Sequence, residues 1–248
     1  MNNVLLVTGG GRGIGAATAG LAAERGYRVC VNYRTNRQAA DAVVAKIRSS
    51  GGDALAVGAD VAVEADVVRL FETVDAQLGP LTALVNNAGI LETQTRVEQI
   101  DAARIDRVFG TNVRGAFICA REAVRRMSTK HGGAGGAIVN VSSRAAQLGA
   151  PGEYVDYAAS KAALAALTVG LAREVAGEGI RVNGVRAGII YTEIHADGGE
   201  PTRVDRLGPT LPMQRGGEAI EVARAIVWLL SDEASYSTAS FIDVAGGR

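Results

Sequence analysis

The amino-acid sequence predicts an α/β fold in which helices cover both faces of a parallel β-sheet. Short runs of β-branched and apolar residues alternate with longer segments of helical periodicity along the whole chain. The runs are apolar throughout instead of alternating with polar residues, which indicates strands that are buried on both faces. Strands of this kind, separated by helices, form parallel sheets. Because no linker interrupts the alternation, residues 1–248 are expected to form a single doubly wound domain of the Rossmann type.

Seven strands are expected, each separated from the next by a helix or a loop. The strand candidates are residues 4–9, 27–33, 54–61, 83–89, 137–143, 180–188 and 240–247. The helical segments lie near 13–25, 36–50, 64–78, 97–128, 155–177 and 217–231. In the segment 64–78, one helical face carries all the large apolar residues, namely Val67, Leu70, Phe71, Val74 and Leu78. The main irregular stretch, 191–216, has the length of loops that often cover a functional site, and we expect it to contact the substrate.

Composition and charge restrict the classes of function. Of the 248 residues, 48% are hydrophobic, and 26 basic side chains balance 26 acidic ones. Surfaces that bind nucleic acid or anionic membranes need a basic excess, so neither partner is expected. No uncharged run approaches the ~20 residues of a membrane helix, and the first residues do not resemble a secretion signal. We therefore expect a cytoplasmic protein.

The cysteines and histidines give no indication of a metal site. Cys30 and Cys119 stand among apolar residues, as buried structural cysteines do. No cysteine pair has the spacing of metal ligands, and His131 and His195 have no ligand-like neighbours. No metal is therefore expected.

A cluster of glycines joins the first expected strand to the first helix. In VLLVTGGGRGIGAAT, Gly9, Gly13 and Gly15 would allow a tight turn and a close approach of the backbone to a ligand. The helix that follows offers free N–H groups and the positive end of its dipole, which suits a pyrophosphate. No Gly-Lys-Ser/Thr follows, so the loop is not of the Walker type. Its place in a β-α-β unit predicts a dinucleotide site.

The end of the second strand indicates which dinucleotide binds. An acidic residue there would hydrogen-bond the ribose hydroxyls of NAD and repel a 2′-phosphate. The sequence instead has Asn32, Tyr33 and Arg34, with no acidic residue before Asp41. Arg12 in the glycine loop would add a second positive charge. Two arginines near the adenosine ribose favour NADP(H), and NAD(H) is the alternative if both are solvated surface residues.

The stretch EYVDYAASKAAL, residues 153–164, places a lysine among small apolar residues of an expected helix. Residues four apart share a helix face, so Tyr157 and Lys161 are neighbours, whereas Tyr154 lies ~10 Å from Lys161 along the axis. A tyrosine that exchanges protons near neutral pH needs a pKa well below its usual ~10, which requires about 4 kcal/mol. A solvated ammonium supplies only ~1 kcal/mol. The pair therefore predicts a shielded site beside a further positive charge, such as an oxidised nicotinamide.

Five motifs in order resemble those of the short-chain dehydrogenase/reductase family, over nearly the whole chain. They are TGGGRGIG (8–15), NNAG (86–89), the asparagine of GTNVRG (110–115), VNVSS (139–143) and YAASK (157–161). The chain resembles 3-oxoacyl-carrier-protein reductases and, in the stretch NYR, some glucose dehydrogenases. The resemblance implies a small-molecule carbonyl or alcohol substrate and a homotetramer or homodimer.

The resemblance also implies roles for individual residues. Tyr157 would exchange a proton with the carbonyl or alcohol oxygen, and Lys161 would bind the nicotinamide ribose and lower the pKa of Tyr157. Ser143, in preference to Ser142, would orient the substrate oxygen. Asn112 would hold a water that links Lys161 to solvent. With the residues of the glycine loop and the second strand, the expected cofactor contacts are Gly9, Arg12, Gly13, Ile14, Gly15, Asn32, Tyr33, Arg34, Asp60, Val61, Asn86, Ala88, Gly89, Tyr157, Lys161, Gly188, Ile190 and Thr192.

Three positions depart from the family pattern. Ser143 precedes Tyr157 by 14 residues, one more than is usual, which indicates an extra residue in the intervening loop. Ala187 stands where a proline is usual, so φ is freer there and an N–H is added. Ala239 stands where a glycine is common, and it is strained if the backbone there needs positive φ.

These observations together predict an NADP(H)-dependent oxidoreductase of class EC 1.1.1.-, with Tyr157 as general acid and base. One alternative is a sugar or polyol dehydrogenase that works chiefly with NAD. The other is a nucleotide-binding sensor that keeps the fold and has lost catalysis; the complete set of Asn112, Ser143, Tyr157 and Lys161 argues against it, because a sensor has no chemical need for those four.

Overall fold

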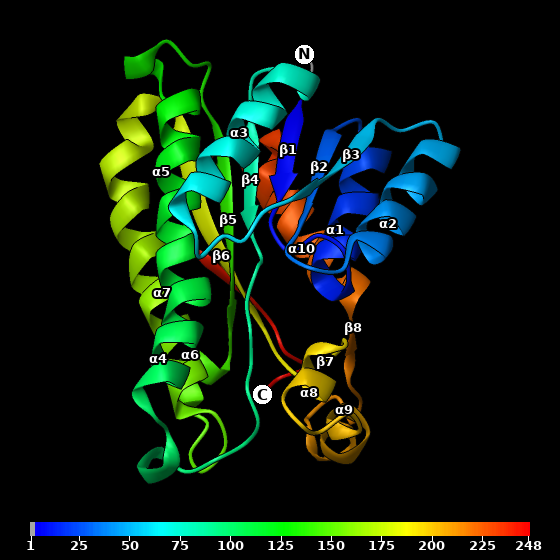
Figure 1. The fold of residues 1–248 in the computed structure, drawn as a ribbon, viewed down its shortest axis with the longest axis vertical. Coiled ribbons are helices and arrows are strands. Elements are labelled where there is room, and N and C mark those ends of the chain that lie inside the picture. Colours follow the sequence, from blue (N-terminus) through cyan, green and yellow to red (C-terminus); the bar gives the residue numbers. More distant parts are fainter. Residues whose placement is uncertain (1–2) are drawn as a thin grey trace.

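In the computed structural model, which describes residues 3–248, seven strands form one parallel sheet in the order β3-β2-β1-β4-β5-β6-β9 (Figure 1). The predicted doubly wound fold is confirmed. Neighbouring strands are in parallel register, with Val7 beside Val31 on one side and Val85 on the other. The strands of this sheet are β1 (Val4–Val7), β2 (Arg28–Tyr33), β3 (Ala54–Gly58), β4 (Ala83–Asn86), β5 (Gly136–Ser143), β6 (Ile180–Ala187) and β9 (Phe241–Val244).

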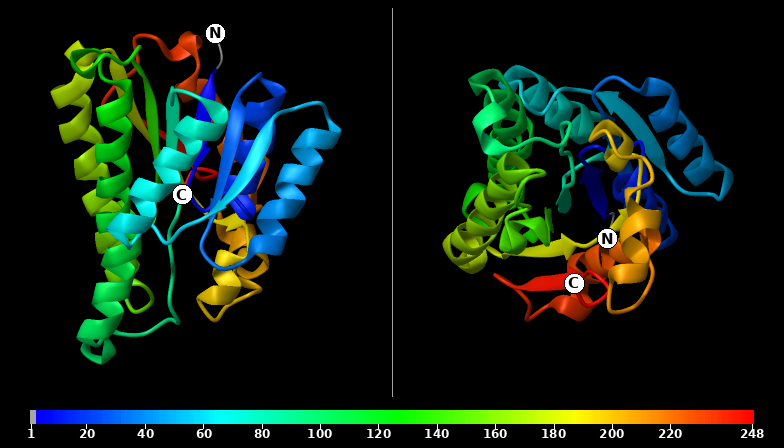
Figure 2. Two further views of the ribbon diagram at one scale, coloured as in Figure 1. Left: turned by 45° about the horizontal axis from the view of Figure 1, so that its top comes forward. Right: turned by 90° about the horizontal axis from the view of Figure 1, so that it is seen from below.

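Helices cover both faces of the sheet, as Figures 1 and 2 show. One face carries α1 (Gly13–Glu24), α2 (Arg37–Ser49) and α10 (Ala219–Leu230), and the other carries α3 (Glu64–Leu78), α5 (Ala116–Met127) and α7 (Val155–Val175). Alternate residues of a strand point to opposite faces, so β1 sends Leu5 and Val7 into the first core and Val4 and Leu6 into the second. Burial on both faces explains why the strands are apolar throughout.

The segment 97–128, predicted as one helix, is broken. It consists of the turn η1 (Val97–Gln99), α4 (Ala102–Phe109), a π-helical turn η2 (Gly110–Gly115) and α5. Asp101 begins α4, because its side chain accepts the N–H of Arg104 (2.7 Å). A Cβ on Gly115 would lie 2.8 Å from the Val61 side chain, so the glycine lets the chain pass close to the end of β3. Helical periodicity alone does not reveal such a local widening, which often marks a functional site.

The segment 191–216, expected to be irregular, contains short regular elements. These are β7 (Ile190–Tyr191), α8 (Ile194–Asp197), α9 (Arg203–Leu207) and η5 (Gly208–Thr210), and β8 (Gly217–Glu218) pairs with β7. A small core of Ile189, Val204 and Leu211 holds them together. Figures 1 and 2 show that this segment projects beyond the carboxyl ends of the strands. The other short elements are η3 (Thr129–His131), α6 (Ala145–Leu148), η4 (Ala176–Glu178) and η6 (Asp232–Ala234).

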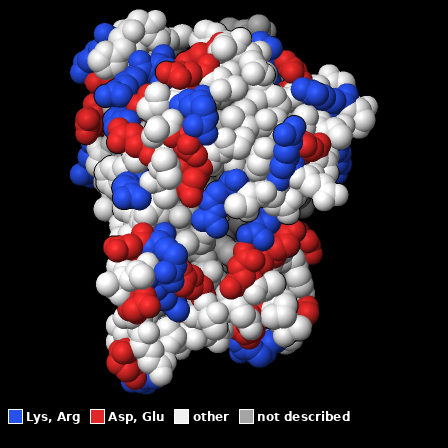
Figure 3. All heavy atoms as spheres, in the orientation of Figure 1, with Lys and Arg blue, Asp and Glu red and all other residues white. Residues whose placement is uncertain are grey.

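Within residues 3–248, the stretch Val155–Glu178 is long and apolar enough to span a membrane, judged by length and composition. It contains α7, which packs against β5 and β6 and buries Lys161. Its apolar residues therefore serve the packing of the sheet. On the face shown in Figure 3, basic and acidic side chains are interspersed, in keeping with a formal net charge of zero.

The strain expected at Ala239 is present, because its φ is +56°. This left-handed conformation costs an alanine about 1–2 kcal/mol. A hydrogen bond from the N–H of Ala239 to Val182 O (2.8 Å) keeps the residue in this conformation.

A glycine at position 239 avoids the strain but raises the entropy of the unfolded chain. We expect Ala239→Gly to raise the free energy of unfolding in urea by about 0.5 kcal/mol. The matched control, Ala45→Gly in the exposed middle of α2, should lower it by about 1 kcal/mol. Equal losses in both variants would contradict the strain.

Candidate active site

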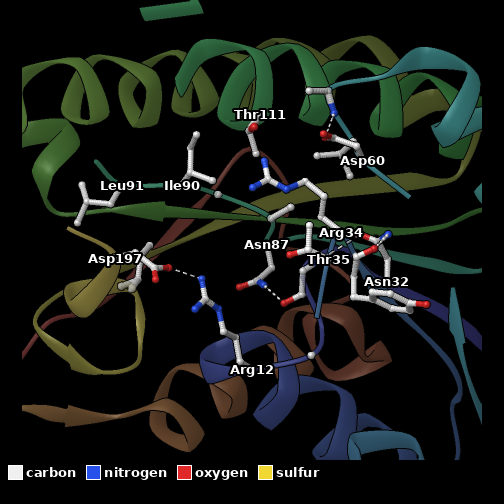
Figure 4. Close-up of a pocket in the computed structure, with 18 of the residues that line it drawn as sticks. Arg12, Asn32, Arg34, Thr35, Asp60, Asn87, Ile90, Leu91, Thr111 and Asp197 are labelled. Atoms are coloured by element: carbon white, nitrogen blue, oxygen red, sulfur yellow. Dashed lines mark hydrogen bonds and ion pairs between the residues drawn. The ribbon is translucent and has the colours of Figure 1, made fainter. Parts of the chain in front are cut away.

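A large cleft of about 890 Å³ opens at the carboxyl ends of β1, β2, β3 and β4. In parallel sheets this edge binds ligands where the strand order reverses, as it does here between β1 and β4. Its volume lies within the usual range for ligand sites. The expected residues that line it are Gly9, Arg12, Gly13, Ile14, Asn32, Tyr33, Arg34, Asp60, Val61, Ala88, Gly89 and Thr192 (Figure 4). Several of them lie in stretches that were expected to belong to strands, such as 59–61 and 87–89, but that turn into the cleft instead.

The glycine loop is clamped against the loop that follows β4. Gly9 and Gly13 have φ of +60° and +51°, conformations that favour glycine. A Cβ on Gly9 would lie 3.0 Å from Ala88 Cα. The Asn87 side chain donates to the carbonyls of Thr8 and Gly9 (3.0 Å each), and the Thr8 hydroxyl accepts the N–H of Ala88 (3.0 Å). These contacts fix the glycine loop at the edge of the cleft, where its backbone can approach a bound phosphate group. The residues of the loop therefore fit a dinucleotide.

Two of the expected cofactor contacts do not line the cleft. Gly15 is buried inside α1, where a Cβ would lie 2.4 Å from Gly9 O, so it serves the packing of the loop instead of lining the cleft. The Asn86 side chain points into the core and donates to Asn140 Oδ1 (3.0 Å) and Ala116 O (3.2 Å). Its neighbour Asn87 lines the cleft in its place. The alternation of side chains along β4 would have distinguished the two.

The polar residues at the end of β2 and just after it have different surroundings. Asn32 is buried; its side chain accepts the N–H of Gly9 (3.2 Å) and donates to Ala59 O (3.0 Å), so it joins the glycine loop to the end of β3. Arg34 lines the cleft and is exposed. Arg12, expected to add a second charge beside the ribose, instead forms an ion pair with Asp197 of α8 (Figure 4). Arg34 is therefore the cation that the chain after β2 contributes to the cleft.

A second, smaller cavity of about 140 Å³ adjoins the cleft and shares Ile14, Gly89 and Thr192 with it. It lies between the ends of β5 and β6 and the projecting segment. Five further expected site residues line it, namely Ser143, Tyr157, Lys161, Gly188 and Ile190. Residues not expected individually also line it, among them Arg144, Glu153, Tyr154, His195, Arg203 and Arg248. The structure thus brings the tyrosine, the serine and the lysine together next to the cleft.

The two serines at the end of β5 point to opposite sides, as expected. Ser142 is buried and donates to Lys161 O (3.0 Å), so it anchors α7 to the sheet. The hydroxyl of Ser143 lies close enough to the Tyr157 hydroxyl to lower its pKa, and it accepts the N–H of Ala145 (3.1 Å). Tyr154 lies apart from this group and donates to Gly198 O (3.3 Å). Tyr157 is therefore the tyrosine that faces Ser143.

Burial controls the protonation of Tyr157 and Lys161. It raises the pKa of Tyr157 to about 12, although the hydrogen bond from Ser143 acts in the opposite direction. Burial also lowers the pKa of Lys161 to about 8. The ammonium lies 5.7 Å from the centre of the Tyr157 ring and donates to Val141 O (2.8 Å). Lys161 alone therefore does not produce the expected lowering of the Tyr157 pKa, which requires further positive charge beside the ring.

Asn112 lies in the π-helical turn η2 and is buried. Its side-chain amide donates to Ile90 O (3.1 Å) and to the Ser160 hydroxyl (3.0 Å), and its oxygen accepts the N–H of Ile90 (2.8 Å). A Cβ on Gly89 would lie 3.3 Å from the Lys161 ammonium and 3.5 Å from Asn112 Oδ1, so both groups meet at this glycine. Asn112 thus joins the loop after β4 to α7, and both of its amide protons are already engaged.

The fold and this site define the class of protein: the chain belongs to the short-chain dehydrogenase/reductase family of oxidoreductases. A family model described as "Enoyl-(Acyl carrier protein) reductase" matches residues 9–248. Among solved structures, a short-chain dehydrogenase/reductase double mutant from Serratia marcescens is 35% identical with a TM-score of 0.90, over 99% of this chain and 97% of that one. A dehydrogenase/reductase from Sinorhizobium meliloti 1021 has a TM-score of 0.91 at 32% identity, covering 99% and 94%.

Particular relatives are similar over their whole length. The uncharacterized oxidoreductase YgfF of Escherichia coli K12 is 62% identical over 99% of both chains. The 3-oxoacyl-[acyl-carrier-protein] reductase FabG of Staphylococcus aureus is 37% identical, over 100% of this chain and 98% of its own.

Proposed function

We propose that this protein is an NADP(H)-dependent oxidoreductase that interconverts a small carbonyl compound and the corresponding alcohol. One observation carries the proposal: a tyrosine beside a serine, with a buried lysine four residues further on, lines a small cavity that adjoins a cleft large enough for a dinucleotide. A nicotinamide dinucleotide bound in the cleft would supply or accept the hydride. The glycine loop and the loop after β4 would hold it, with Thr192, Gly188 and Ile190 close to its reactive end.

The residues of the chain account for the proton. Tyr157 transfers its hydroxyl proton to the carbonyl oxygen as the alcohol forms, and takes it back in the reverse direction. Ser143 lies beside the same hydroxyl, and with Tyr157 it stabilises the negative charge that develops on the substrate oxygen. Lys161 uses one of its protons on Val141 O, which leaves the others for the nicotinamide ribose. Its positive charge, together with that of an oxidised nicotinamide, favours the phenolate.

The first test follows the absorbance of NADPH and NADH, each with a panel of ketones, quinones and aldehydes. The proposal expects turnover that is faster with NADPH. Turnover with NADH alone, chiefly of sugars or polyols, would favour the alternative of a sugar or polyol dehydrogenase. The ion pair of Arg12 with Asp197 supports this alternative, because it takes away one of the two positive charges expected to favour NADP(H). Tight binding of NADPH without turnover of any substrate would favour the catalytically silent sensor.

The preference for NADP(H) is expected to depend on Arg34. Because a hydrogen bond between charged groups contributes about 1.5–3 kcal/mol, Arg34→Ala should raise KM for NADPH about 10- to 100-fold and leave KM for NADH within a few-fold. The control is Arg37→Ala, which removes an exposed arginine that pairs with Asp41 one turn along α2. The assignment is wrong if Arg34→Ala weakens both cofactors equally.

Three further features are proposed, the assembly from the resemblance and the other two from composition and charge. The chain would act as a homotetramer or homodimer, in the cytoplasm, and without nucleic-acid or membrane partners. The assembly and the location stay predictions, and the molecular mass in solution tests the first of them.

A further inference from the structure

Three arginines from distant parts of the chain meet at the small cavity that holds Tyr157. Arg144 follows β5, Arg203 lies in α9, and Arg248 follows β9. Lys161 adds a fourth positive charge, and Glu153 is the acidic residue among those that line the cavity. Basic side chains therefore outnumber acidic ones along the cavity lining, although the formal net charge of the whole chain is zero.

Two of the three arginines are neutralised by acidic partners. Arg203 is buried and pairs with Glu200 (2.7 Å) and Glu153 (2.5 Å). The guanidinium of Arg144 pairs with Asp243 (2.8 Å). These ion pairs join the projecting segment and the end of β5 to the rest of the protein, so both arginines have a structural role.

Arg248 differs from the other two. Its backbone is fixed, because its N–H donates to Ala245 O (3.2 Å) and an oxygen of its main-chain carboxyl group accepts the Arg144 Nε–H (2.7 Å). Within residues 3–248, however, its half-buried guanidinium has neither an ion pair nor a hydrogen bond. Burial lowers the pKa of Arg248, and repulsion from Arg203 and Arg144 adds to this, with Glu153 acting in the opposite direction. A partly buried cation without a partner is unfavourable unless a ligand supplies the anion.

We propose that the substrate carries a carboxylate, which Arg248 binds while the reacting carbonyl or alcohol group lies against Tyr157 and Ser143. The guanidinium matches a carboxylate with two parallel hydrogen bonds. The cavity, at about 140 Å³, is close in size to one that holds benzene, so it admits about six to eight non-hydrogen atoms. The substrate class is thus a short oxo acid or hydroxy acid. This inference rests on the proposed function, since it names the substrate of the same site.

The test compares three oxo acids with their methyl esters as substrates with NADPH: 2-oxobutanoate, 3-oxobutanoate and 4-oxopentanoate. The three differ in the distance between the carboxylate and the ketone. For at least one of them, kcat/KM should be about 10- to 100-fold higher for the acid than for its ester. Arg248→Gln should remove that preference by lowering kcat/KM for the acid. The control Arg224→Gln, on the exposed side of α10, should keep it.

A binding measurement separates this inference from the proposed function. Calorimetry with the NADP⁺-loaded Tyr157→Phe variant, which does not need turnover, should show that the same oxo acid binds and that adding Arg248→Gln weakens its binding about tenfold or more. If no compound turns over but this binding difference is found, the proposed function fails and the carboxylate site stands. If the esters react as well as the acids and Arg248→Gln changes neither turnover nor binding, the carboxylate site is wrong and the oxidoreductase remains.

Discussion

Tyr157→Phe is expected to lower kcat by about 10²- to 10⁴-fold, the usual contribution of a general acid or base. The substitution removes only the hydroxyl that lies beside Ser143. The cleft itself is lined by other residues, so the affinity for NADPH, measured by fluorescence titration, should change no more than a few-fold. The loss should therefore appear in kcat with little change in cofactor binding.

Tyr154→Phe is the matched control for this prediction. Tyr154 lies one turn earlier and lines the same cavity, but its hydroxyl donates to Gly198 O, at the end of α8. We expect kcat of this variant to stay within a few-fold of the native value. If both variants lose activity alike, or if Tyr157→Phe fails to bind NADPH, the role assigned to Tyr157 is wrong.

Lys161→Met is expected to make the protein more stable in the absence of cofactor and to abolish turnover. Burial lowers the pKa of Lys161 from 10.5 to about 8. Because one pH unit in pKa corresponds to about 1.4 kcal/mol, holding the charged form costs about 3 kcal/mol at neutral pH. The hydrogen bond to Val141 O offsets part of this cost. Methionine has a similar length and no charge, so the free energy of unfolding should rise by about 2 kcal/mol in urea at pH 7.

The direction of the pKa shift of Lys161 determines how the stability difference between the two proteins changes with pH. The folded-state pKa of Lys161 lies below the unfolded-state value, so between pH 8 and 10.5 the unfolded chain binds more protons. The native protein should therefore gain stability relative to Lys161→Met as the pH rises through this range. The control is Lys46→Met, which removes an exposed lysine from the last turn of α2 and should change the stability at pH 7 by less than about 0.5 kcal/mol. A Lys161→Met variant that is less stable at pH 7 would contradict the cost assigned to the buried charge.

The sequence by itself determined the fold class, the order of the elements and the central pair of the candidate site. These depend on local patterns. Continuous apolar runs indicate strands buried on both faces, and a spacing of four places Tyr157 and Lys161 on one face of α7. The positive φ required at Ala239 could also be anticipated, because a glycine is common there in the family that the chain resembles.

Only the tertiary structure decided which side chains face the cavities and which charges have partners. The π-helical turn at Asn112 depends on a close approach to Val61, and the ion pair of Arg12 with Asp197 joins residues 185 positions apart. The convergence of Arg144, Arg203 and Arg248 has the same origin. A periodic pattern reports only on neighbours along the chain, whereas the charge and shape of these cavities depend on contacts between residues that are far apart in the sequence.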